Sequence, residues 1–120
     1  MKKKSLTYWR KKCVEDAKVK AKERDGYKCQ KCGRSKAQGF QMHGSHNYPE
    51  SIYKSMSADV ENILTLCAIC HMDWHENPIK AAEWFNKKYP ELSKILRKRA
   101  QKCTVIDWEK RYKEMKQYTI

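Results

Sequence analysis

The sequence lacks any apolar run long enough to cross a membrane. Lysines at positions 2–4 resemble the positive start of a secretion signal, but no apolar segment of the required length follows them. These absences predict an intracellular, cytoplasmic protein with no membrane partner. Because thiols stay reduced in that compartment, the six cysteines are expected to act as metal ligands rather than as disulfides.

Acidic residues are scarce as well, with 14 against 27 basic residues and a net charge of +13. The imbalance is confined to the two ends of the chain. Residues 37–78 contain one basic residue, Lys54, against five acids, so this stretch carries −4 and the flanks together carry +17. This segregation predicts flanks that grip a phosphate backbone around a central metal-dependent site. The alternative is a solvated basic surface without a polyanion partner.

Apolar residues are few for a chain of this length, at 40% hydrophobic against 34% charged. With 120 residues we expect a single domain, residues 1–120, whose modest core needs additional support. The sequence contains no internal repeat and no low-complexity tract.

Helical patterns at both ends enclose an irregular middle. Residues 5–25 have helical spacing and are followed by Gly26, so residues 1–26 are expected to form a basic N-terminal helix. Residues 27–77 contain frequent Gly, Pro, Ser and Asn residues, which predict short elements joined by turns. In residues 78–120 we expect helices that start after Asn77, at Pro90 and at Thr104. The apolar stripes predicted for the four helices are Leu6, Trp9, Cys13, Ala17 and Ala21; Ile79, Ala82 and Phe85; Leu92, Ile95, Leu96 and Ala100; and Val105, Trp108, Tyr112 and Met115.

Four of the six cysteines form two pairs, Cys29 with Cys32 and Cys67 with Cys70. The two-residue spacing places both sulfurs of a pair on one tight turn, where they can bind the same tetrahedral ion. Two such pairs, a few tens of residues apart, predict a structural zinc site. Paired disulfides or a redox pair are the alternatives, although a redox pair needs only one CxxC. The remaining two, Cys13 and Cys103, are expected to be small buried apolar residues on helices.

All four histidines lie in the middle segment: His43, His46, His71 and His75. If the segment after Cys70 is helical, His71 and His75 project from one face and can share one metal ion. The alternative is that they are further zinc ligands or surface residues. Since four thiolates already satisfy a structural zinc, a second and open metal site is the better interpretation.

The stretch from Asn62 to His75 resembles the second half of an HNH, or ββα-metal, nuclease motif, and the stretch from Met42 to Pro49 resembles its first half. Zinc-bearing members of that family have one CxxC before the hairpin and another at the start of the helix, as this sequence has. The similarity to small phage and prophage HNH nucleases extends over residues 24–84, about half of the chain.

The resemblance implies an α+β fold, in which a zinc-bound treble-clef ββα-metal module at residues 27–77 is flanked by basic helices. It implies a metal-dependent DNA endonuclease, nicking or cutting both strands, encoded by a phage or mobile element and acting in the bacterial cytoplasm. DNA is the expected partner. A second copy of the chain and phage recombination or packaging proteins are further candidates.

The resemblance also implies a role for each residue of the motif. His46 would be the general base, Asn62 would hold the loop that orients it, and His71 and His75 would bind Mg²⁺, Mn²⁺ or another divalent ion. The structural Zn²⁺ would be bound by Cys29, Cys32, Cys67 and Cys70.

One position departs from the family pattern. Ser45 stands just before the base, where the family often has Asp or His as a further metal ligand. His43, two residues earlier on the same strand face, could replace it. Otherwise the ion has only two protein ligands, or the site is weakened or inactive.

Two rival functions remain open: a non-catalytic zinc module that binds DNA or RNA, and a protein-interaction module in a phage assembly. Tyr48 and Tyr53 are expected either to touch DNA or to pack. Tryptophans 9, 74, 84 and 108 are expected in the core. A dense basic helix, some of whose residues are expected to meet phosphates, carries Lys94, Arg97, Lys98, Arg99 and Lys102.

Overall fold

The computed structural model describes residues 3–102 and 104–117, so Cys103 lies outside the described residues. Over this range the chain forms an α+β fold of five α-helices and one two-stranded antiparallel sheet, which confirms the α+β part of the predicted fold class. The elements are α1 (Leu6–Arg24), β1 (Met42–His46), β2 (Ile63–Cys67), α2 (Ala68–Glu76), α3 (Pro78–Lys88), α4 (Pro90–Ala100) and α5 (Trp108–Gln117), with short 3-10 turns η1 (Lys36–Gln38), η2 (Lys54–Met56) and η3 (Val60–Asn62). No helix in this part of the chain is both long and apolar enough to cross a membrane.

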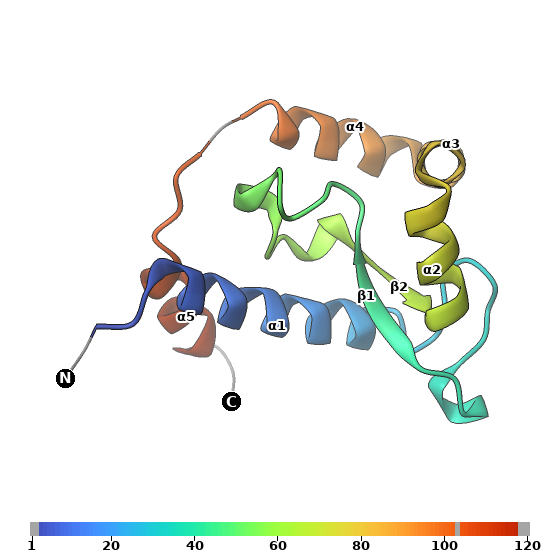
Figure 1. The fold of residues 1–120 in the computed structure, drawn as a ribbon, viewed down its shortest axis with the longest axis horizontal. Coiled ribbons are helices and arrows are strands. Elements are labelled where there is room, and N and C mark those ends of the chain that lie inside the picture. The colour runs from blue at the N-terminus through green and yellow to red at the C-terminus, as the bar shows by residue number, and fades with distance from the viewer. Residues whose placement is uncertain (1–2, 103, 118–120) are drawn as a thin grey trace.

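The hairpin of β1 and β2 lies between two groups of helices (Figure 1). α1 and α5 cover one side, and α2 to α4 lie on the other. The strands pair with Met42 opposite Cys67 and His46 opposite Ile63. Every residue of β2 is buried, as expected for a strand enclosed between helices. The loop after His46 returns to β2 through η2 and η3.

Two apolar clusters hold these layers together. One joins the sheet to α2, α3 and α4 through Leu66, Trp74, Phe85 and Leu96, among others. The second joins α1 to α5 and to the start of β2. Its buried members are Cys13, Val14, Ala17, Ala21, Ala58, Ile63 and Trp108.

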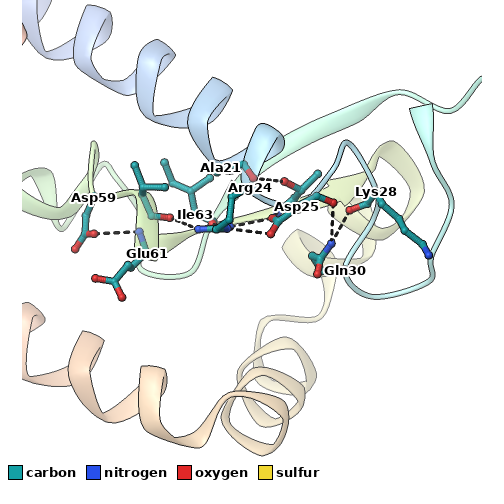
Figure 2. Close-up of polar contacts among 10 residues, drawn as sticks. Ala21, Arg24, Asp25, Lys28, Gln30, Asp59, Glu61 and Ile63 are labelled. Atoms are coloured by element: carbon teal, nitrogen blue, oxygen red, sulfur yellow. Dashed lines mark hydrogen bonds and ion pairs between the residues drawn. The ribbon is translucent and has the colours of Figure 1, made fainter. Parts of the chain in front are cut away.

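The C-terminal end of α1 is fixed to β2 by polar contacts (Figure 2). Arg24 donates hydrogen bonds to the main-chain oxygens of Val60 and Ile63, at 2.9 and 2.6 Å. The carboxylate of Asp25 binds the Arg24 guanidinium at 2.9 Å and accepts the Thr65 amide at 3.1 Å. The N-terminal helix is therefore fixed against the strand that leads into the second cysteine pair.

Several apolar residues lie elsewhere than predicted. The core face of α3 is Ala81 and Phe85, four residues apart, while Ile79 is 75% exposed and Ala82 is also exposed. The small Ala81 lets α3 pack against the cluster that contains Trp74, and this contact sets the rotation of the helix. Leu6 on α1 is also exposed.

The last helix begins later than predicted. Thr104 does not cap it, and Val105 is fully exposed. α5 instead begins at Trp108, after Asp107, whose carboxylate accepts the Lys110 amide at 3.1 Å. An aspartate caps a helix as well as a threonine does, so the sequence alone did not discriminate between the two positions.

Candidate functional site: a four-cysteine cluster and a histidine cleft

Both cysteine pairs meet in one cluster. The sulfur atoms of Cys29, Cys32, Cys67 and Cys70 all lie within 4.8 Å of one another, and the Cys32 and Cys67 sulfurs are 3.6 Å apart. Four sulfurs bound tetrahedrally to zinc, with bonds of about 2.3 Å, lie roughly 3.8 Å apart. The cluster therefore has the donor set and the spacing of a metal-binding site.

Each pair occupies a turn in which main-chain amides point at sulfur. The Cys32 amide donates to Cys29 Sγ at 3.5 Å, and Gly33 continues the turn with φ +85°, a left-handed conformation that favours glycine. In the second pair, Cys67 ends β2 and caps α2, and its sulfur accepts the Cys70 amide at 3.5 Å. Such N–H···S contacts stabilise the thiolate form that binds metal.

The four thiols can ionise together only beside a cation. Burial raises the pKa of Cys67, but the Cys70 amide, the neighbouring thiols and Arg34 lower it to about 6. Burial and the neighbouring thiols raise the pKa of Cys70. Arg34 lies 3.6 Å from Cys32 Sγ and 3.9 Å from Cys67 Sγ. One guanidinium cannot balance four thiolates, so a divalent cation is needed for all four to ionise.

A cleft of about 670 Å³ opens beside the hairpin. Its wall includes three of the four residues predicted to act in catalysis: His46 from β1, and His71 and His75 from α2. Lys18 from α1 and Arg97 from α4 also line it, so elements outside residues 27–77 contribute to the same cavity. The remaining wall is mixed: Gly44, Asn47, Tyr48, Pro49, Glu50, Ser51, Trp74, Pro78, Ala81, Ala82, Phe85, Asn86 and Ser93.

Three imidazoles form a row at this site. His43 Nδ1 lies 2.8 Å from His71 Nδ1, and His71 Nε2 lies 3.0 Å from His75 Nε2. His43, which was predicted as a possible replacement for the ligand missing at Ser45, thus contacts His71 on α2. The three histidines do not form a compact metal site. Among the described residues, only the four cysteines bring three or more potential metal-ligand atoms within 4.8 Å of one another.

His71, in the middle of the row, is neutral. Burial, with the charges of His75 and His43, lowers its pKa to about 4. Each contact in the row needs one N–H and one lone pair, so a neutral His71 donates to one neighbour and accepts from the other. Neutral imidazoles are the form that binds metal ions.

His46 stands apart from the row and has a defined tautomer. Its Nε2 lies 2.7 Å from the main-chain oxygen of Ser57. A carbonyl oxygen only accepts, so Nε2 carries the proton and Nδ1 carries the lone pair. Burial lowers the pKa of His46 below the usual 6.5. The ring can therefore accept a proton at Nδ1 near neutral pH.

Asn62 is fully buried and ties the loop after His46 together. Its side-chain oxygen accepts the Tyr48 amide at 2.9 Å, and its nitrogen donates to the oxygens of Tyr48 and Met56, both at 3.1 Å. Met56 immediately precedes Ser57, which binds the His46 ring. Asn62 thus fixes both ends of the loop that orients His46.

Ser45 is buried, and its hydroxyl has no hydrogen-bond partner among the described residues. Tyr48 lines the cleft and packs edge-to-face on Tyr53, with ring centroids 5.1 Å apart.

Arg99 forms ion pairs with Asp59 and Glu61, each at 2.8 Å. Arg99 is therefore held by carboxylates of the loop before β2.

Sequence reasoning missed Lys18 as a cleft residue. A weak signal existed, because Lys18 lies four residues after buried Val14, at the edge of the apolar stripe of α1.

Comparison of the chain with protein-family models, with curated proteins and with solved structures finds no match.

Proposed function

We propose that this protein is a metal-dependent DNA endonuclease of the HNH type, with a zinc-closed treble-clef module at its centre. The observation that carries the proposal is the cleft shared by His46, His71 and His75, in which His46 has a free Nδ1. The order of β1, β2 and α2 agrees with the ββα order of the resembling motif. Simple binding of nucleic acid does not need an oriented base beside a row of three imidazoles.

The chemistry that these residues support is hydrolysis of a phosphodiester. Water attacks phosphorus as its proton passes to His46 Nδ1, and the bond from phosphorus to the 3′ oxygen breaks. The electron pair of that bond stays on the 3′ oxygen, which takes a proton from solvent. Asn62 and the Ser57 carbonyl keep the base oriented. A divalent ion held by His71 and His75 would supply Lewis-acid stabilisation of the phosphate charge. His43 contacts the other ring nitrogen of His71, so it would orient that ligand.

The ligand set suits some divalent ions better than others. Imidazole nitrogen favours Zn²⁺, Ni²⁺ and similar ions, whereas Mg²⁺ and Mn²⁺ prefer oxygen ligands. The protein should therefore be tested with zinc already in its cysteine site, on supercoiled plasmid, with Mg²⁺, Mn²⁺, Ni²⁺ or added Zn²⁺, and with EDTA. Nicked or linear product that depends on an added ion supports the proposal. Binding without cutting in every ion supports the non-catalytic zinc module instead.

Cleavage is expected to rise with pH through the pKa of His46. Only the neutral ring accepts a proton. Burial lowers this pKa below 6.5, the hydrogen bond to the Ser57 carbonyl and the charge of Glu50 oppose the lowering, and the charges of Lys18 and Arg10 add to it. The rate should therefore be level near neutral pH and fall only as the pH drops through the lowered pKa of His46, below the usual histidine range. Single-turnover rates between pH 5 and 8, at saturating metal, provide the measurement. A rate that decreases as pH rises over this range would contradict His46 as the base.

DNA binding is expected to weaken steeply with salt and to show little sequence preference. Arg97 lines the cleft and Lys98 is exposed beside it, so changing both to glutamine should reduce the slope of log Kd against log salt by about 1 per lost phosphate contact. Lys113→Gln is the matched control, because Lys113 pairs with Glu109 on α5, which does not line the cleft. An unchanged slope in the double variant would place the DNA surface elsewhere.

A further inference from the structure

Lys18 on α1 reaches the cleft by crossing β1 at Gly44. A Cβ atom at position 44 would lie 2.8 Å from Lys18 Cγ and 3.0 Å from Lys18 Cβ, and 3.2 Å from Cγ2 of Ile63. The first of these is closer than real Cβ atoms approach. Gly44 does not have a left-handed φ, so glycine is required here by the space that the lysine stem occupies. The sequence thus leaves a gap in β1 through which α1 contributes a side chain.

The positive charge of Lys18 lowers the pKa of two histidines of the cleft, the candidate base His46 and the candidate metal ligand His71. Lys18 lines the cleft with His46 and His71. Burial is the largest cause that lowers the pKa of His46 and of His71, and the charge of Lys18 contributes to both. Lys18 therefore shares the cleft with the candidate base and with a candidate metal ligand.

Lys18 has no counter-ion in the described part of the chain. No described carboxylate lies within 4.0 Å of its ammonium, whereas Lys20 on the same helix pairs with Asp16 at 2.9 Å. Glu50 also lines the cleft, but it lies 3.9 Å from Arg10. A half-buried, unpaired ammonium in a cleft attracts an anion, and a phosphate between His46 and His71 is the anion that the site would handle.

We propose that Lys18 is a catalytic residue that binds a non-bridging oxygen of the scissile phosphate and stabilises the second negative charge that develops there in the transition state. This inference rests on the proposed nuclease function. The bonds made and broken are those of the hydrolysis described above. Lys18 lies on α1, outside residues 27–77, and α1 is fixed to β2 by Arg24 and Asp25.

The test compares single-turnover cleavage of plasmid and DNA affinity in four proteins: the parent, Lys18→Met, Lys18→Arg and Lys20→Met. Lys18→Met keeps the length of the stem without its charge, and should slow cleavage by about 10²- to 10³-fold while DNA affinity changes only a few-fold. Lys18→Arg keeps the charge and should recover at least a tenth of the parent rate. Lys20→Met, which alters the same helix outside the cleft, should stay within about three-fold of the parent.

Two controls separate the charge from structural effects. Circular dichroism and one bound zinc per chain show whether Lys18→Met is folded, and Lys18→Gln replaces it if it is not. A folded variant that cuts as fast as the parent would overturn this inference while leaving the nuclease function intact. A loss of affinity that matches the loss of rate would also overturn it, because Lys18 would then be an ordinary backbone contact. If the parent itself never cuts, both the function and this inference fail.

Discussion

Replacing His46 by alanine is expected to slow DNA cleavage by two to four orders of magnitude, the usual contribution of a positioned general base. DNA binding and metal binding should persist, because His46 lies outside the row of His43, His71 and His75 and is not part of a basic flank. Single-turnover cleavage of plasmid at saturating metal measures the rate, and equilibrium binding of the same DNA measures the affinity.

The control for this variant acts on the orientation of the ring. Asn62→Ala removes the side chain that joins Tyr48 to Met56, and so loosens the loop that carries Ser57. Its cleavage rate should fall less than that of His46→Ala, because the base remains but is less well oriented. If His46→Ala cuts at the parent rate, the assignment of the base is wrong.

Replacing Cys67 by serine is expected to unfold the protein or make it insoluble. Structural zinc contributes on the order of 10 kcal/mol to folding in small zinc domains, which is comparable with the whole free energy of unfolding of an ordinary domain, roughly 5–15 kcal/mol. Cys67 both joins the cluster and caps α2, so its loss affects the helix that carries His71 and His75. Metal analysis and circular dichroism, with and without a chelator, provide the measurement.

Cys13→Ser is the matched control for that variant. Cys13 is equally buried, but it lies in the interface of α1 with α5, where its thiol contacts the Trp108 oxygen at 3.6 Å. A serine hydroxyl can make the same contact, so the free energy of unfolding should decrease by only about 1–2 kcal/mol. A soluble, fully helical Cys67→Ser protein without zinc would contradict the role of the cluster in folding.

The sequence predicted the cysteine cluster well because spacing determines its local geometry. Two residues between thiols specify a turn, and this turn directs amides such as those of Cys32 and Cys70 at sulfur. Helix existence was also predictable from periodicity, as for α1 with Ser5 at its N-terminus. Those features depend on neighbours within one turn of the chain.

What the sequence did not predict depends on contacts between distant elements. Ile79 and Ala82 fit a helical stripe as well as Ala81 does, and only packing against Trp74 makes Ala81 the buried residue. The contact of His43 with His71 depends on the relative placement of β1 and α2. Strand alternation allowed that contact but did not specify it.

Lys18 and Arg99 illustrate the same point for charge. The sequence places both in basic helices, where a solvated face is the ordinary expectation. In the fold, Lys18 enters a cleft over Gly44, whereas Arg99 is held by Asp59 and Glu61. Neither position can be predicted from the local sequence pattern, because each side chain contacts residues more than twenty positions away along the chain.

The central claim is that the histidine cleft, and not the cysteine cluster, cuts DNA with a bound divalent ion. Plasmid cleavage by the parent and by His71→Ala, each carrying one zinc and each assayed with added divalent ions and with EDTA, tests this claim most directly. We predict that the parent nicks or linearises plasmid only with an added ion, and that His71→Ala keeps its zinc and its DNA affinity but does not cut. Equal cutting by both proteins, or no cutting by either in any ion, would contradict the claim.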